Sequence, residues 1–193
     1  MKYKEIIETS SNKTAEKNST AAIAFGRLNP PTIGHQKLVD KLQSSPGDPF
    51  LFLSHTHKRK TDPLDFETKL KFAKLFFPDI SVGDHSVRTI VQALEKIEEL
   101  GYKNIIYVAG SDRVEDFSKF LKKYNEVEQH FDSIEVASAG NRDPDAKNAA
   151  GMSASKMREF AEQDQFEEFA KGVPDPALAD KLFKAVQDSM NIK

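Results

Sequence analysis

The sequence predicts an α/β protein with a doubly wound, mainly parallel, Rossmann-like sheet of five strands, helices on both faces and a helical C-terminal region. Two observations carry this prediction. Short, continuous apolar runs recur along the chain, as is typical of strands buried on both faces of a parallel sheet. Segments with helical periodicity separate these runs, and this alternation favours right-handed crossovers around a single sheet.

The predicted strands are five apolar runs whose lengths suit strands rather than helices. Three are strong, at 21–25, 50–54 and 104–110, with the sequences AAIAF, FLFLS and NIIYVAG. A weaker run, SIEVAS, occupies 133–138, and ISVG at 80–83 is expected to form a short edge strand.

Amphipathic segments at 35–43, 65–77, 87–101 and 112–124 are the predicted helices around the sheet. The third has the clearest pattern, with one apolar face and a terminal glycine: Val87, Ile90, Val91, Leu94, Ile97 and Gly101. No strand is expected after about residue 152, where the pattern indicates two or three helices broken by VPDP at 173–176.

The chain of 193 residues divides into three predicted regions. Residues 1–19 form a polar N-terminal arm that we expect to be partly disordered. Residues 20–160 form the Rossmann-like domain, and residues 161–193 form a helical extension packed on it. A composition with 38% hydrophobic and 30% charged residues describes a globular protein that can bury a substantial core.

Composition also narrows the classes of function. The chain has no cysteine, which excludes disulfides, thiolate metal sites and cysteine nucleophiles and fits a cytoplasmic location. No apolar run approaches the roughly 18 residues of a transmembrane helix, and the N-terminus lacks the apolar stretch of a signal peptide, so no membrane partner is expected. The net charge is −2, and the basic loop has no interleaved aromatic residues on which bases could stack. Both features disfavour a protein that binds single-stranded nucleic acid.

The segment 26–35, GRLNPPTIGH, follows the first predicted strand, and open α/β sheets bind ligands at that position. Its glycines allow the backbone to approach a bound group, and the next helix start offers unpaired N–H groups and a positive dipole end. The segment therefore predicts a phosphate site. Its nucleotide-binding candidates are Gly26, Arg27, Asn29 and Gly34.

The other side chains of this segment agree with a bound anion. Thr32 supplies a hydroxyl, and His35 and Lys37 place cationic groups in the first turn of the helix, where they oppose the helix dipole. The competing interpretation is a proline turn in which Thr32 caps the helix and His35 is a surface residue.

The segment 151–161, GMSASKMREFA, opens a second helix with the same unusual charges. Ser153 or Ser155 can cap this helix, and Lys156 and Arg158 stand near its first turn. A polyphosphate shared between both helix starts would explain cations at two places where acids are expected. The competing interpretation is a serine-capped surface helix whose charge is balanced by later glutamates.

The basic loop SHTHKRKTDPLDF, 54–66, follows the second predicted strand. It is suited to a phosphorylated acceptor, which His57 and Lys58 would bind, whereas a solvated charge cluster is the alternative. Its two histidines lack a set of partner ligands with suitable spacing, so no metal site is predicted.

Two further segments complete the predicted site. In VAGSDR, 108–113, Gly110 and Ser111 are expected to face the base and ribose of a nucleotide, and Asp112 either joins them or caps the following helix. His85 and Arg88 are expected to open the helix at 87–101, where Arg88 is a further candidate for binding the acceptor.

Together, GRLNPPTIGH and SASKMR resemble the nucleotidyltransferase superfamily that carries HxGH and ISSTxxR motifs. The resemblance spans residues 21 to about 160, and it is specific because both motifs occur in the family's order. Thr32 stands at the first histidine position and His35 at the second. In the second motif Ser155 replaces the threonine and Arg158 retains the arginine, whereas Ala154 replaces a serine and removes one phosphate hydrogen bond.

The resemblance implies transfer of a nucleoside monophosphate, AMP from ATP, to a phosphorylated small-molecule acceptor, with release of pyrophosphate and with Mg²⁺ bridging the phosphates. The Gly-Arg pair at 26–27 looks more like nicotinamide-mononucleotide adenylyltransferases of archaeal type than cytidylyltransferases, which favours ATP over CTP. The implied catalytic residues act by positioning and charge stabilisation: His35, Thr32, Arg158 and Lys60.

Two alternatives stay open. One is a cytidylyltransferase that uses CTP, and the other is a catalytically silent nucleotide-binding module of a larger assembly. A homo-oligomer is compatible with the sequence, which does not identify the acceptor.

Overall fold

The computed structural model describes residues 19–128, 130–140 and 151–192, so the predicted N-terminal arm lies outside it except for its last residue. One sheet contains β1 (Thr20–Gly26), β2 (Asp48–Leu53), β3 (Ser81–Val82), β4 (Asn104–Ala109) and β5 (Ser133–Ser138). The strand order is β3-β2-β1-β4-β5, and every neighbouring pair is parallel. The predicted doubly wound sheet and its short edge strand are therefore confirmed.

The helices occupy the predicted intervals between the strands and after the last one. They are η1 (Ile33–His35), α2 (Gln36–Ser44), α3 (Phe66–Phe76), α4 (Ile90–Glu99), η2 (Ser111–Arg113), α5 (Val114–Glu128), α6 (Ala154–Glu162), α7 (Phe166–Ala170), η4 (Pro176–Leu178) and α8 (Ala179–Met190). Among the described residues, none of these helices combines the length and the apolar composition that a bilayer-spanning segment requires.

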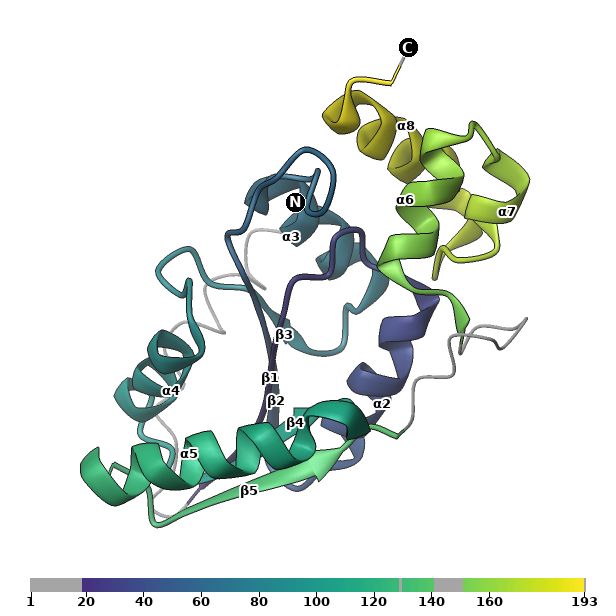
Figure 1. Cartoon of the computed structure of the whole chain (residues 1–193). Helices are drawn as coiled ribbons and strands as arrows, with labels where there is room; N and C mark the ends of the chain where they lie inside the picture. Colours follow the sequence, from purple (N-terminus) through teal and green to yellow (C-terminus); the bar gives the residue numbers. More distant parts are fainter. Residues whose placement is uncertain (1–18, 129, 141–150, 193) are drawn as a thin grey trace, which may run out of the picture.

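Both faces of the sheet are covered, which explains why its strands are continuous apolar runs. In β1, Ala22 and Ala24 belong to the core formed with α2, α3 and the C-terminal helices, whereas Ala21 and Ile23 belong to the core formed with α4 and α5. Figure 1 shows α2 and α4 on opposite sides of the central strands. Each residue of such a strand meets a covering layer, so polar residues do not alternate with apolar ones.

The C-terminal helices α6, α7 and α8 lie together beside the end of β1 (Figure 1). Phe169, Leu182 and Val186 of these helices are fully buried in the core that also contains β1 and β2. A hydrogen bond of 2.8 Å from the Ile33 N–H to the Gly172 carbonyl ties the segment after α7 to η1. The last forty residues therefore contribute directly to the surroundings of η1.

The start of α4 differs from the prediction by about one turn. Asp84 accepts hydrogen bonds from the N–H and hydroxyl of Ser86, and Thr89 caps the helix with its side-chain oxygen. These bonds between side chains and nearby backbone stabilise a turn ahead of the helix. The prediction that His85 and Arg88 open the helix is therefore wrong, because both precede its cap.

Candidate active site

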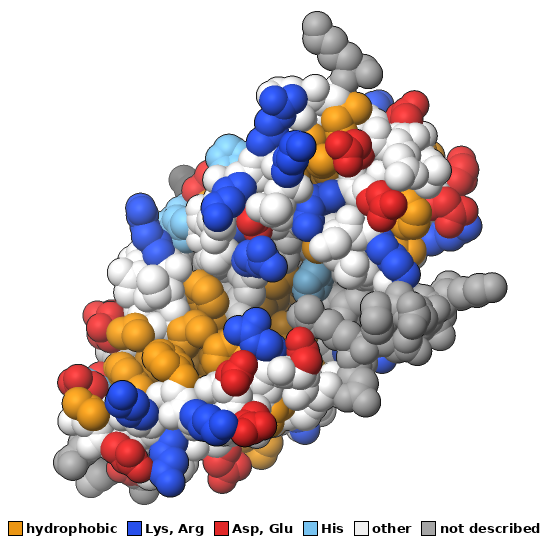
Figure 2. Space-filling view, viewed as in Figure 1, with side chains coloured by type: hydrophobic (Ala, Val, Ile, Leu, Met, Phe, Trp, Pro, Cys, Tyr) orange, Lys and Arg blue, Asp and Glu red, His pale blue; other side chains and the backbone are white. Residues whose placement is uncertain are grey.

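A cavity of about 870 Å³ lies at the carboxyl ends of β1 and β4. Connections from these neighbouring strands lead to opposite halves of the sheet, so the cavity occupies the topological switch point where α/β folds bind ligands. Figure 2 shows basic side chains gathered on the upper half of this face and apolar side chains between α4 and α5.

Most of the predicted site residues line this cavity. Those brought together are Gly26, Arg27, Asn29, Thr32, Gly34, His35, Gly110, Ser111, Asp112, Ser153, Ser155 and Arg158. Four residues predicted to contact the acceptor or the triphosphate do not line it: His57, Lys58, Lys60 and Arg88.

At the first helix start, Thr32 and His35 form a reciprocal cap. The side chain of Thr32 accepts from the backbone N–H of His35, and the Thr32 N–H donates to Nδ1 of the His35 ring at 2.9 Å. Because a backbone N–H can only donate, Nδ1 is unprotonated and the neutral ring carries its hydrogen on Nε2. The same two side chains therefore both cap the helix start and line the cavity.

The two predicted motifs meet directly. Thr32 is fully buried, and its Oγ1 donates to the carbonyl of Met152 at 3.0 Å. A Cβ atom placed on Gly34 would lie 2.5 Å from that same carbonyl oxygen. Gly34 is thus required for the close approach of the two segments, a reason separate from any approach of a phosphate.

Gly34→Ala is expected to separate the two helix starts and to lower the free energy of unfolding by about 1–3 kcal/mol, because the added methyl group meets backbone. Thermal unfolding and ATP binding measure the two effects. Gly26→Ala is the control for stability, since its Cβ would meet Cδ1 of Leu28, the end of a side chain that can rotate. A Gly34→Ala protein with the melting temperature of the unmodified chain would contradict this account.

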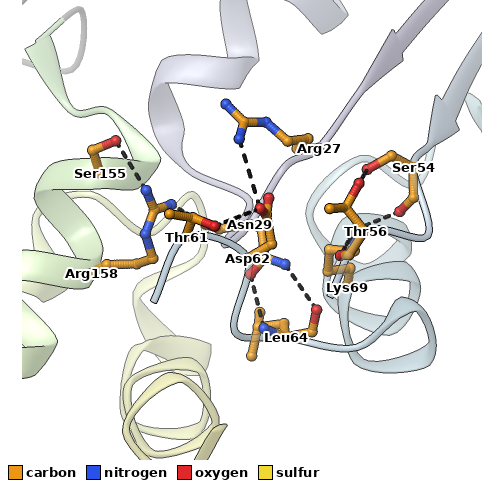
Figure 3. Close-up of polar contacts among 10 residues, drawn as sticks. All are labelled: Arg27, Asn29, Ser54, Thr56, Thr61, Asp62, Leu64, Lys69, Ser155 and Arg158. Carbon is orange, nitrogen blue, oxygen red and sulfur yellow. Dashed lines mark hydrogen bonds and ion pairs between the residues drawn. The ribbon is translucent and has the colours of Figure 1, made fainter. Parts of the chain in front are cut away.

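The second helix start places an arginine against the first motif. Ser153 is the N-cap of α6 and accepts from the N–H of Lys156 at 3.2 Å, and the first turn holds no acid. Arg158 donates from Nη1 to the carbonyl of Asn29 at 2.6 Å and from Nη2 to Oγ of Ser155 at 3.1 Å (Figure 3). Burial lowers the pKa of Arg158, and the nearby Asp62 carboxylate opposes that change.

Asn29 has a structural function that the sequence does not indicate. Its amide nitrogen donates to the carbonyl of Leu64 at 2.8 Å, and its amide oxygen accepts from the N–H of the same residue at 3.0 Å. These two bonds join the loop after β1 to the loop before α3. The side chain of Asn29 is thereby engaged with protein, and its carbonyl orients Arg158.

The loop after β2 forms a hairpin that is closed by backbone hydrogen bonds. Two backbone hydrogen bonds, of 2.9 and 2.8 Å, pair Lys58 with Asp62. Arg59 donates from Nε to the carbonyl of Met190 at 2.8 Å and so caps the C-terminal end of α8. His57, Lys58 and Lys60 point to the surface and are exposed. One cation of the predicted cluster therefore stabilises a helix end.

A buried lysine supports this hairpin from below. Lys69 of α3 is fully buried and donates from Nζ to the carbonyl of Ser54 at 2.6 Å. Burial lowers its pKa to about 8, and the charge of Asp62 opposes that change. At neutral pH the ammonium group is still mostly protonated, so positive charge lies beneath the loop.

Two features of the cavity wall are not evident from the sequence. Asp62 follows a run of basic residues in the sequence and is only 2% exposed. Its Oδ2 lies 3.7 Å from Nη1 of Arg27 (Figure 3). Phe25, Tyr107 and Phe117 form an aromatic arm between α4 and α5, with ring centroids of the last two 4.7 Å apart. The sequence does show an acid and several aromatic residues at these positions. It does not show that they lie on the cavity wall, because that depends on contacts between distant segments.

The end of β4 contributes a polar turn to the wall. Gly110 is the N-cap of η2, and its carbonyl accepts from the N–H of Arg113 at 2.9 Å. Asp112 lies inside this turn rather than at the cap of α5, and it is exposed and lines the cavity. The guanidinium carbon of Arg113 lies 5.2 Å from the ring centroid of Phe117, at the border with the aromatic arm.

No family model matches this sequence, and no curated protein matches it significantly. Solved structures do match. Plasmodium falciparum nicotinic acid mononucleotide adenylyltransferase complexed with NaAD has a TM-score of 0.63 at 15% identity, over 91% of this chain and 100% of that one. The same protein complexed with APC gives 0.62 at 15% identity, with the same coverage.

A Vibrio parahaemolyticus protein assigned as a nicotinate-nucleotide adenylyltransferase gives a TM-score of 0.58 at 19% identity, over 87% of this chain and 94% of that one. At these identities the likeness establishes the fold. This chain shares the Rossmann-like fold of these structures, as the alternation of strands and helices in its sequence predicts.

Proposed function

We propose that this protein is an adenylyltransferase, which transfers AMP from ATP to a phosphorylated small-molecule acceptor and releases pyrophosphate. The observation that carries the proposal is the junction of two cation-bearing helix starts, held together by the hydrogen bond from Thr32 to Met152, on the wall of one cavity. The shared fold with adenylyltransferases supports ATP rather than CTP as the nucleotide.

In the proposed reaction an oxygen of the acceptor phosphate attacks the α-phosphorus of ATP, and the bond to the β-phosphate oxygen breaks as pyrophosphate leaves. His35 donates from Nε2 to the phosphates, because its Nδ1 is occupied by the Thr32 N–H. Arg158 offsets negative charge that develops on the triphosphate, and the hydroxyl groups of Ser153 and Ser155 add neutral donors. No covalent intermediate is needed, so positioning and electrostatic stabilisation supply the catalysis.

The cavity suggests separate places for the two substrates. The polar turn at Gly110, Ser111 and Asp112 suits the ribose and base of ATP, as the sequence predicts. The aromatic arm, with Phe117 and Tyr107, suits the part of the acceptor that carries no phosphate. The residues assigned to the acceptor phosphate, His57, Lys58 and Arg88, do not line the cavity, and neither does Lys60, which is assigned to the triphosphate; all four would have to reach the phosphates from outside its wall.

The described residues fit a magnesium ion that arrives with the nucleotide. They contain no group of three or more histidine, aspartate or glutamate side chains suited to hold a metal by themselves. Mg²⁺ in nucleotide sites is commonly held by substrate phosphates and water, with one or two carboxylates. Asp112 is the exposed carboxylate of the wall that is available for this contact. When bound, the ion would neutralise charge on the phosphates.

The test is a measurement of pyrophosphate release from MgATP and from MgCTP, with a panel of phosphate monoesters that includes nicotinate and nicotinamide mononucleotides. We expect release with ATP and at least one acceptor, and none when the acceptor is omitted. If ATP raises the melting temperature but no acceptor gives pyrophosphate, the protein is a nucleotide-binding module. Release with CTP alone would identify a cytidylyltransferase.

A further inference from the structure

Asp62 is a buried carboxylate that is incompletely hydrogen-bonded. It is 2% exposed, and the hairpin that it closes with Lys58 brings it to the wall of the cavity. Its Oδ2 accepts from Oγ1 of Thr61 at 3.0 Å and lies 3.7 Å from Nη1 of Arg27. Its Oδ1 is buried and has no hydrogen-bond partner in the described part of the chain. A buried carboxylate in this state needs compensation by opposite charge.

That compensation comes from cations on three elements. Figure 3 shows Asp62 between Arg158 of α6 and Lys69 of α3, with Arg27 from the end of β1 close by. Burial lowers the pKa of both Lys69 and Arg158, and Asp62 opposes the change in each. The carboxylate therefore stabilises the charged forms of cations that belong to separate segments.

The two arginines retain a surplus of positive charge toward the cavity. Arg158 donates to the carbonyl of Asn29 and the hydroxyl of Ser155, and neither acceptor carries a charge that would neutralise it. Arg27 is 68% exposed at its side chain, and its contact with Asp62 is long. One carboxylate thus neutralises only part of the positive charge of these cations. An anionic ligand would neutralise the remaining positive charge.

We propose that Asp62 is a positioning residue that holds Arg27 on the cavity wall beside Arg158 before a polyphosphate binds and that limits the affinity of the empty site for it. This inference rests on the proposed function, because a polyphosphate is the ligand that both arginines would serve. Asp62 acts through the arginines, since its Oδ1 is buried too deeply to meet a ligand. An incoming phosphate competes with Asp62 for Arg27, while Asn29 keeps Arg158 oriented.

The experiment compares the full-length chain with Asp62→Asn by calorimetric titration with inorganic tripolyphosphate and with MgATP. Removing a negative charge near the phosphates is expected to tighten tripolyphosphate binding about threefold to tenfold. Pyrophosphate release at saturating ATP is expected to fall at least about tenfold, because Arg27 loses its fixed position beside Arg158. Asp65→Asn is the matched control: Asp65 caps α3, lies outside the cavity lining and can be replaced by another good cap.

Unchanged or weaker tripolyphosphate binding in Asp62→Asn would overturn the proposal, and so would tighter binding with undiminished turnover. If Asp62→Asn does not fold, Asp62→Glu keeps the charge but displaces it. That variant is expected to bind tripolyphosphate within about twofold of the unmodified chain and to turn over more slowly; normal turnover would overturn the proposal. If the unmodified chain releases no pyrophosphate with any acceptor, the proposed function fails, and the tripolyphosphate titration alone decides the role of Asp62.

Discussion

His35→Ala is expected to reduce turnover by about a hundredfold or more, on the scale of losing one donor that stabilises developing charge. The ring lines the cavity, and its Nδ1 accepts from the N–H of Thr32, so the hydrogen on Nε2 is the one that it can offer to a phosphate. Pyrophosphate release at saturating ATP and acceptor measures the effect. ATP affinity is expected to change less than turnover, because the donor acts mainly as charge develops.

The same substitution removes one half of the reciprocal cap, so stability must be separated from catalysis. His35→Gln is the control, since glutamine at this position of a helix start can accept from the N–H of Thr32 as the ring does. We expect it to restore the melting temperature but not the turnover. A His35→Ala protein with near-normal turnover would remove His35 from the catalytic group and leave the fold unaffected.

Arg158→Ala is expected to weaken ATP binding about tenfold to a hundredfold, the range for losing a charged hydrogen-bond donor. The guanidinium group is half-buried, and it joins the loop at Asn29 to the helix at Ser155. Its removal therefore takes away a positive charge and also releases the two segments that form the wall. Calorimetric titration with MgATP measures the change in affinity.

Two comparisons identify the source of that effect. Arg158→Lys keeps the charge but cannot make two donations in the plane of a guanidinium group, so an intermediate affinity is expected. Lys184→Ala controls for a general loss of positive charge, because Lys184 lies on α8 and pairs with Asp180 at 2.9 Å, away from the cavity. Unchanged ATP affinity in Arg158→Ala would place the second motif outside the nucleotide site.

Much of the fold follows from local pattern. The strands can be predicted from the sequence because a parallel sheet that is covered on both faces needs continuous apolar runs. Residues 21–24 of β1, which are all buried, are an example. The two helix starts can be predicted as anion sites because hydroxyl groups and cations replace the acids that favour a helix N-terminus. The sequence predicts that the two helix starts lie near each other only because the fold places both at one end of the sheet. The hydrogen bond from Thr32 to Met152 shows that they are in contact.

The parts of the fold and of the site that the sequence does not predict depend on contacts between segments that are distant in sequence. Asp62 follows four basic or hydroxyl residues and reads as a solvated acid, yet the hairpin with Lys58 buries it. Arg59 has no sequence feature that predicts a bond to Met190, because the partner is 131 residues away. The sequence predicts too early a start for α4, because apolar periodicity extends back to Val87, whereas the turn before Thr89 is stabilised by polar side chains.

The hydrogen bond from Ile33 to Gly172 connects the first helix start to the segment after α7, so ligand binding at the proposed site would be linked to the folding of the C-terminal helices. A molecule that binds the first helix start would favour the state in which this hydrogen bond is made and so stabilise α6, α7 and α8 against local opening. Linkage is reciprocal, and an event that detaches these helices must weaken that ligand by the same factor. The C-terminal region is therefore positioned to regulate the affinity of a site to which most of its residues make no direct contact.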